Sequence, residues 1–253
     1  MKDLDFLTRN IIAHRGFFNN KDGIPENSIL AFEKAIQSNF MIELDVHLLK
    51  DNKIVVFHDD NLKRMTGLDK EIKDCTYSEI EKLRLLDTEQ KIPLFEEVLE
   101  LVSGKVPILI ELKYDVKVGL LENEIMKLLE NYNGKCAVQS FSPNTVYWFK
   151  KNAPEVVRGQ LSCAFDKKKM NKISKFALSN LVFNIFTKPD FVSYNIHSVE
   201  KILSKIGRNM ILLGWTVKTK QEYEKYVEIC DNLICENLNF LNINACKNKK
   251  YGI

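Results

Sequence analysis

Met41-Ile42-Glu43-Leu44-Asp45-Val46-His47-Leu48 is an apolar stretch that carries two carboxylates two residues apart. After Leu49, only Lys50-Asp51-Asn52-Lys53 separates it from a second apolar run, Ile54-Val55-Val56-Phe57. A connection this short leaves no room for the helical crossover that parallel strands require, so the two runs predict an antiparallel hairpin. A two-residue turn at Asp51-Asn52 suits residue types that tolerate positive φ.

This turn would set Asp45 opposite His58 and Glu43 opposite Asp60. Cross-strand partners share one face of a sheet, about 5 Å apart. We therefore expect the hairpin to bring His58 beside the two acids.

Short apolar runs alternate with amphipathic segments along the rest of the chain, which is typical of β-α units around a parallel sheet. The expected strands are Ile11–Ala13, Met41–Leu48, Ile54–Phe57, Val106–Glu111, Cys136–Ser140, Val157–Leu161, Phe191–Tyr194, Ile211–Val217 and Asn232–Cys235. The expected helices include Ser28–Ser38 with Asn27 as N-cap, Leu94–Ser103, Gly119–Tyr132, Pro143–Asn152, Lys167–Phe176, Ser198–Ile206 and Lys220–Glu228. Without the antiparallel strand, eight remain, so we predict an α/β protein of the (β/α)8 TIM-barrel type with one extra hairpin strand after strand 2.

No linker or low-complexity stretch divides the chain, and we expect one domain over 1–253. The segment at about 61–91 is polar, with one helical pattern at Ser78–Leu86. We interpret it as a small lid-like excursion from the barrel.

Composition excludes several classes of protein. With 45% hydrophobic and 28% charged residues, the chain is typical of a globular protein, and a formal charge of +3 is too small to indicate nucleic-acid binding. Its six cysteines form no C-x-x-C pair, so neither a zinc site nor a disulfide framework is predicted. The acidic start and the absence of a long apolar stretch favour a cytoplasmic protein without stable membrane insertion. Oligomeric state stays open.

Polar residues gather where the predicted strands end. His14 and Arg15 end the first strand, Glu43 and Asp45 lie on the second, and Glu111 ends the fourth run. Because barrel active sites form at the C-terminal strand ends, these side chains should converge. Three carboxylates without a cysteine suit one hard divalent cation, Mg²⁺ or Ca²⁺.

Each residue also has a structural interpretation. Glu111 could form a salt bridge with Lys113, and His14 could be an ordinary strand-end histidine, although Arg15 offers a planar fork suited to phosphate. His47 shares the face of Glu43 and Asp45, so it is either a fourth ligand or, as we favour, structural. For His197, near a helix start, we favour a structural role.

An ordered set of motifs resembles the glycerophosphodiester phosphodiesterase family. The motifs are His14-Arg15-Gly16, Pro25-Glu26-Asn27-Ser28, Glu43-Leu44-Asp45-Val46, Val55-Val56-Phe57-His58-Asp59, Glu111-Leu112-Lys113 and Gly214-Trp215-Thr216-Val217. The resemblance implies a barrel enzyme that hydrolyses glycerophosphodiesters, as small-molecule substrates, to sn-glycerol 3-phosphate and an alcohol. It further implies His14 and His58 as catalytic residues, Glu43, Asp45 and Glu111 as metal ligands, Arg15 and Lys113 as phosphate contacts, and Trp215 as an aromatic wall, with Gln139, Ser140 and Phe141 lining the pocket.

The resemblance departs most in the last strand, where the family pattern is close to Gly-Ile-Ile-Thr-Asp and this chain reads Asn232-Leu233-Ile234-Cys235-Glu236-Asn237. We expect this change to alter the pocket wall beside the first strand and the substrate preference; the metal and histidine residues themselves are all present.

As a mechanism, we hypothesise that Glu43, Asp45 and Glu111 hold a cation against a phosphate oxygen and the glycerol 2-hydroxyl. One histidine would deprotonate that hydroxyl and the other would protonate the leaving alkoxide, through a cyclic phosphate. Sequence does not decide which histidine is the base.

Three alternatives remain: a lysophospholipase D, a phosphatidylinositol-cleaving phospholipase C, and a silent phosphodiester-binding barrel. Both lipid enzymes require an exposed apolar rim for membrane contact. The sequence indicates no such stretch near the strand ends.

Overall fold

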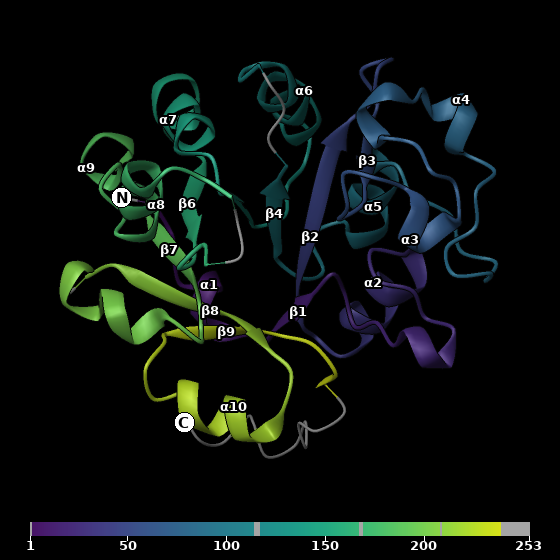
Figure 1. Cartoon of the computed structure of the whole chain (residues 1–253). Coiled ribbons are helices and arrows are strands. Elements are labelled where there is room, and N and C mark those ends of the chain that lie inside the picture. The colour runs from purple at the N-terminus through teal and green to yellow at the C-terminus, as the bar shows by residue number, and fades with distance from the viewer. Residues whose placement is uncertain (1, 114–116, 167–168, 208, 239–253) are drawn as a thin grey trace.

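The computed structural model describes residues 2–113, 117–166, 169–207 and 209–238. Parallel strands close into a barrel (Figure 1): β1 (Ile12–His14), β2 (Met41–Leu48), β4 (Ile108–Leu112), β5 (Cys136–Ser140), β6 (Val157–Ser162), β7 (Phe191–Asn195), β8 (Ile211–Val217) and β9 (Asn232–Cys235). The ring closes because β1 pairs with both β2 and β9. This confirms the predicted (β/α)8 barrel.

The extra strand is also confirmed. β3 (Ile54–Val56) pairs antiparallel with β2, outside the ring. The register, however, differs by one residue from the prediction. Leu49 N–H donates to the Lys53 carbonyl at 2.8 Å, so the turn comprises three residues and ends at Asn52, whose φ is +63°. Phe57, rather than His58, donates its N–H to Asp45, and the expected pairing of Asp45 with His58 is wrong.

One apolar layer fills the barrel near the N-terminal ends of the strands. Each strand of the ring contributes one buried side chain to it: Ile12, Met41, Leu109, Ala137, Val157, Phe191, Leu213 and Ile234. Phe6 and Leu7 of α1 (Phe6–Arg9) pack against this layer and close that end. Polar side chains of the barrel interior are therefore left to the opposite, C-terminal half.

Helices surround the barrel, and most of them, though not α8 and α9, pack against a second, larger core that includes the outward-facing strand residues. They are α2 (Ile29–Gln37), α5 (Phe95–Val102), α6 (Leu120–Leu129), α7 (Pro143–Asn152), α8 (Lys172–Ser179), α9 (Asn184–Thr187), the 3-10 helix Val199–Lys205 and α10 (Lys220–Tyr226). In the part of the chain that the structure describes, no helix is long and apolar enough to span a membrane.

The excursion at about 61–91 has an apolar core of its own, which rests on β3. It contains α3 (Lys63–Thr66), the 3-10 helix Ile72–Asp74 and α4 (Tyr77–Ile80), and its buried side chains include Leu62, Met65 and Ile80. The helix expected at Ser78–Leu86 is only α4. Beyond it the chain turns, with Leu86 and Asp87 at positive φ.

Candidate active site

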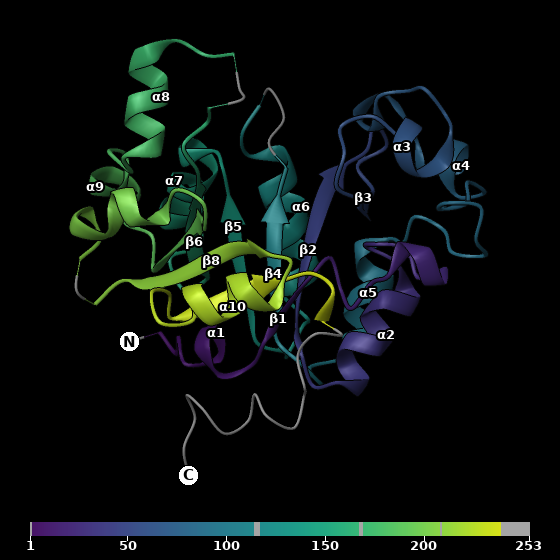
Figure 2. The same cartoon turned by 60° about the horizontal axis from the view of Figure 1, so that its bottom comes forward.

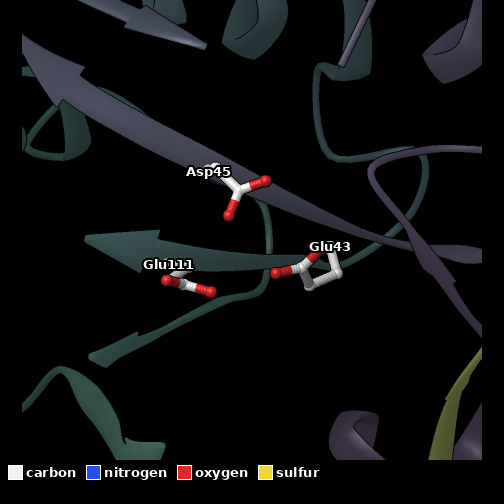
Figure 3. A group of neighbouring side chains, drawn as sticks. All are labelled: Glu43, Asp45 and Glu111. Carbon is white, nitrogen blue, oxygen red and sulfur yellow. The ribbon is translucent and has the colours of Figure 1, made fainter. Parts of the chain in front are cut away.

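Three buried carboxylates lie together on β2 and β4 (Figure 3). Glu43 and Asp45 point to the same side of β2 because side chains alternate along a strand, and Asp45 lies beside Glu111 in the parallel register. One oxygen of each carboxylate lies within 4.8 Å of the others. The structure therefore brings together the acids in which the sequence predicted a metal site.

Crowding and burial shift the acidity of this group. Burial, with the neighbouring charges of Asp45 and Glu111, raises the pKa of Glu43 well above its usual value. The pKa of Glu111 is raised too, by burial that Lys113 only partly offsets. Burial would also raise the pKa of Asp45, but Lys113, His58 and Arg15 hold it well below its usual range. Asp45 is thus the carboxylate most firmly held in its ionised form.

Two cations border the acids. Lys113 Nζ lies 2.6 Å from Glu111 Oε1 and 2.7 Å from Asp45 Oδ1, so the salt bridge considered from the sequence is present within the site. Arg15 Nη1 donates to Glu26 Oε1 at 2.6 Å, Arg15 Nε lies 3.4 Å from Asp45 Oδ2, and the Arg15 backbone N–H donates to Glu43 Oε2 at 3.1 Å. Both predicted phosphate contacts are therefore at the site, anchored by its carboxylates.

Asn27 is a site residue that the sequence analysis misassigned. The N-cap of α2 is Ser28, whose side chain accepts the Ala31 N–H, and not Asn27 as expected. Asn27 instead adopts a left-handed conformation with φ of +55° and donates from Nδ2 to Asp45 Oδ2 at 2.9 Å. Positive φ is uncommon outside glycine, and Asn tolerates it best. This conformation aims the amide at the acids.

His14 is largely buried at the end of β1, with a carboxylate on one side and the acids on the other. Its Nδ1 lies 2.8 Å from Glu236 Oε1, and its Nε2 lies 3.9 Å from Glu43 Oε2. Burial lowers the pKa of His14 despite Glu236. Burial would raise the pKa of Glu236, but hydrogen bonds from His14 and Lys218 lower it to about 2. A charged Glu236 accepts a hydrogen bond from His14 Nδ1–H, which keeps the proton on Nδ1 and leaves Nε2 free to accept a proton.

Glu236 stands where the family pattern ends in Asp. The metal and histidine positions are all filled, as the sequence analysis stated, and the altered last strand adds a carboxylate that contacts His14 directly. The sequence feature that could have predicted this contact is the carboxylate of Glu236. A glutamate just beyond β9, a strand paired with β1, can reach the histidine that ends β1.

His58 is held in the same way from another direction. Its Nδ1 lies 2.6 Å from Asp59 Oδ1, and Arg64 binds the same carboxylate through Nε at 2.6 Å. The charge of a protonated His58 lowers the pKa of both Asp45 and Glu111, so His58 reaches the acid group although its predicted cross-strand partner was wrong. It does so from the loop after β3.

The other histidines and the aromatic residues take distinct places. His47 is buried and does not belong to the acid group. Burial lowers its pKa to about 4, and its Nε2 lies 3.4 Å from the His58 carbonyl, consistent with the structural role that we favoured. His197 is exposed, 3.7 Å from Glu222. Trp215 packs edge-on against Phe141, with ring centroids 5.7 Å apart.

The residues present fit a divalent cation. Glu43, Asp45 and Glu111 offer oxygen ligands only, the set that Mg²⁺ and Ca²⁺ prefer. Burial, together with their mutual repulsion, raises the pKa of Glu43 and Glu111, and a bound cation would offset that repulsion. Asn27 and Lys113 orient Asp45 from outside the group.

Fold and site together define a (β/α)8-barrel protein with an acidic centre, of a composition that fits a cation, between two carboxylate-supported histidines. The model of the glycerophosphoryl diester phosphodiesterase family matches residues 14–235. The chain belongs to this family.

Relatives of known name agree with this membership. A glycerophosphodiester phosphodiesterase of Bacillus altitudinis is 35% identical over 158 residues, which cover 58% of this chain and 63% of that protein. The chain thus matches less than two thirds of that relative's length. One from Caldanaerobacter subterraneus subsp. tengcongensis is 29% identical over 86% of this chain and 89% of its own.

The fold is shared with solved structures. An Oleispira antarctica phosphodiesterase, solved in complex with the product sn-glycerol-3-phosphate, superposes with a TM-score of 0.76 at 19% identity. The match covers 94% of this chain and 98% of that one.

Proposed function

We propose that this protein hydrolyses glycerophosphodiesters to sn-glycerol 3-phosphate and an alcohol, using Mg²⁺ or Ca²⁺ held by Glu43, Asp45 and Glu111. The observation that carries the proposal is the convergence of these buried carboxylates with His14 and His58, each held at Nδ1 by a carboxylate. Family membership and the product complex of the Oleispira antarctica enzyme support the substrate class.

In the proposed mechanism, Arg15 and Lys113 bind the phosphate oxygens, and Trp215 with Phe141 forms the wall beside the substrate. When bound, the cation supplies Lewis-acid chemistry that lowers the pKa of the glycerol 2-hydroxyl. His14 Nε2 removes the proton of that hydroxyl, whose oxygen attacks phosphorus to give a cyclic phosphate. His58 Nε2–H protonates the leaving alkoxide as the bond from phosphorus to the leaving oxygen breaks.

Water then opens the cyclic phosphate, with the two histidines in exchanged roles. His58 takes a proton from the water, and His14 returns its proton to the glycerol 2-oxygen. We assign His14 as the first base because it is the more buried histidine and burial lowers its pKa, which keeps it neutral near pH 7.

The test is release of glycerol 3-phosphate from glycerophosphocholine, with and without chelator, and after Mg²⁺ or Ca²⁺ is restored. General acid or base catalysis contributes about 10²- to 10⁴-fold, so H14A and H58A should each lower kcat by that amount. H197A is the matched control, because His197 is exposed and outside the acid group. A 2-deoxy analogue should be nearly inert.

Two results would contradict the proposal. Equal activity in chelator and in Mg²⁺ or Ca²⁺ would exclude a catalytic role for the metal. Normal turnover of the 2-deoxy analogue would exclude the cyclic phosphate and indicate direct attack by water. Complete inactivity of folded protein with every metal would favour the silent binder.

A further inference from the structure

The connection between β6 and β7 exposes large apolar side chains. Six of them form what we call the α8–α9 surface: Ile173 (83% exposed), Phe176 (64%), Val182 (40%), Phe183 (39%), Ile185 (73%) and Phe186 (64%). Soluble proteins rarely leave a group of this size and kind open to water without a binding role. The sequence analysis expected no exposed apolar stretch near the strand ends, and the structure corrects this.

The helix expected at Lys167–Phe176 differs from α8 in its bounds, and α8 leaves its apolar residues open to water. The helix begins at Lys172, five residues later than predicted, since Asn171 caps it by accepting the Ser174 N–H. None of its residues is buried. Its C-terminal end is anchored, where Ser162 Oγ donates to the Leu178 carbonyl at 2.9 Å and Tyr194 Oη to the Ser179 carbonyl at 2.8 Å. The apolar side chains are therefore held outward on a fixed base.

The segment that carries this surface has charged side chains of one sign only. From 167 to 188 the sequence contains six lysines and no acidic residue. Lys169 and Lys172 are exposed, and Lys175 binds Asp166, which precedes the segment, at 2.6 Å. Exposed aromatic and aliphatic residues set among lysines are the composition with which proteins bind anionic lipid surfaces.

The surface lies on the side of the barrel where the active site opens. α8 stands beyond the end of the barrel toward which the strand arrows point, and it lies opposite the excursion with α3 and α4 in both views (Figures 1 and 2). A row of three aromatic rings begins at the C-terminal end of β6, just before the segment that leads to α8. Phe165, which follows β6, contacts Phe141 with centroids 6.0 Å apart, and Phe141 contacts Trp215.

We propose that the α8–α9 surface docks this protein on an anionic lipid membrane, with the active-site mouth facing the lipid. A second copy of the chain is a poorer partner, because a symmetric contact would set lysines against lysines. The docking proposal depends only on the composition and position of the α8–α9 surface, and not on the proposed activity. Its consequence for the substrate rests on the proposed phosphodiesterase: phosphodiesters drawn from that membrane carry an acyl chain, which the row Phe165, Phe141 and Trp215 would receive.

Flotation of the full chain with vesicles tests the docking without using activity. We expect binding to vesicles of phosphatidylglycerol and phosphatidylcholine in equal parts, weakened by high salt, and little binding to phosphatidylcholine alone. K169Q/K172Q should weaken binding about 25-fold, from roughly fivefold for each lysine near an anionic surface. I173Q/F176Q should weaken it by about tenfold or more.

Matched controls lie on the excursion. K73Q/K82Q removes two exposed lysines and L68Q one exposed apolar residue on the opposite side of the barrel, and both should float like the unaltered protein. Equal flotation of all variants, or no flotation of the unaltered protein, would overturn the proposal. So would sedimentation showing a dimer that I173Q/F176Q converts to monomer.

Activity separates the two proposals. Every variant should cleave glycerophosphocholine at the normal rate, whereas I173Q/F176Q should lose about tenfold on lysophosphatidylglycerol presented in the anionic vesicles. Flotation without any phosphodiesterase activity would preserve the docking and refute the proposed function. If K169Q/K172Q and I173Q/F176Q both cleaved lysophosphatidylglycerol in vesicles at the normal rate, docking through the α8–α9 surface would not deliver the substrate.

Discussion

Glu236→Gln tests how His14 is prepared for its proposed role. Glu236 Oε1 lies 2.8 Å from His14 Nδ1, and the contact is charge-assisted whenever the imidazole is protonated. Gln keeps the size of the side chain and removes its charge. The substitution should therefore leave the geometry of the site nearly unchanged and withdraw stabilisation from the imidazolium that forms as His14 takes a proton.

The magnitude follows from the contact. A hydrogen bond to a charged group contributes about 1.5–3 kcal/mol, so kcat/KM should fall about 10- to 150-fold. The pH profile should shift as well. Glu236 raises the pKa of His14, so its removal lowers that pKa further below the usual value, and the acid limb of kcat/KM should move to lower pH.

Folding stability gives an independent readout. A folded-state pKa of about 2 lies below the ordinary value of 4.5, so charged Glu236 stabilises the fold above about pH 4.5, and this contribution disappears as pH falls toward 2. It amounts to about 3 kcal/mol at most, from about 1.4 kcal/mol per pKa unit. E236Q should lack this pH-dependent component.

The assay is glycerol 3-phosphate release from glycerophosphocholine between pH 4 and 9, with urea unfolding at several pH values. E200Q is the control, because Glu200 forms an exposed ion pair with Lys225 on the surface. If E236Q kept the unaltered kcat/KM and the unaltered acid limb, Glu236 would have no part in preparing His14. A loss of activity without any shift of the limb would leave it a purely structural residue.

Three further predictions concern the cation, Asn27 and the barrel interior. Mg²⁺ or Ca²⁺ should raise the thermal midpoint of the unaltered protein, because a ligand of the folded state stabilises it, and E43Q should abolish the increase. N27A should lower the free energy of unfolding by about 1–3 kcal/mol in urea titrations and weaken Mg²⁺ binding, since Asp45 Oδ2 loses a buried donor. G159A should cost about 1–3 kcal/mol in the same titrations, because its Cβ would lie 2.2 Å from the Phe191 ring, whereas G207A, with nothing within 4 Å, should be nearly neutral.

The barrel could be predicted because its determinants are local. Each strand is a short apolar run, and the short connection between β2 and β3 excludes a parallel crossover. The register of that hairpin could not be predicted in the same way. Two- and three-residue turns both fit Lys50-Asp51-Asn52-Lys53, and the choice depends on the Leu49–Lys53 hydrogen bond, which the residue types do not specify.

The acid group was predictable for a similar reason, since period-two alternation and strand order place Glu43, Asp45 and Glu111 together. The contacts that loop residues make with this group could not be predicted in this way. Asn27 has the residue type of an N-cap, and only the backbone at φ of +55° shows that its amide points to Asp45. Glu236 approaches His14 across 222 positions of sequence, a contact that exists only when the ring of strands closes.

The supports of the two histidines differ in a way that bears on their proposed roles. Glu236, which contacts His14, also binds Lys218, whose side chain is 58% exposed. The series of contacts that starts at His14 therefore ends at an exposed lysine. Asp59, which holds His58, is bound by Arg64, and Arg64 also binds Glu26, the partner of Arg15. His58 and the proposed phosphate contact Arg15 are thus joined by one continuous chain of ion pairs. Because such a network fixes its members more firmly than isolated pairs do, we expect a displacement of Arg15 by phosphate to be transmitted to His58, the histidine proposed to protonate the leaving group.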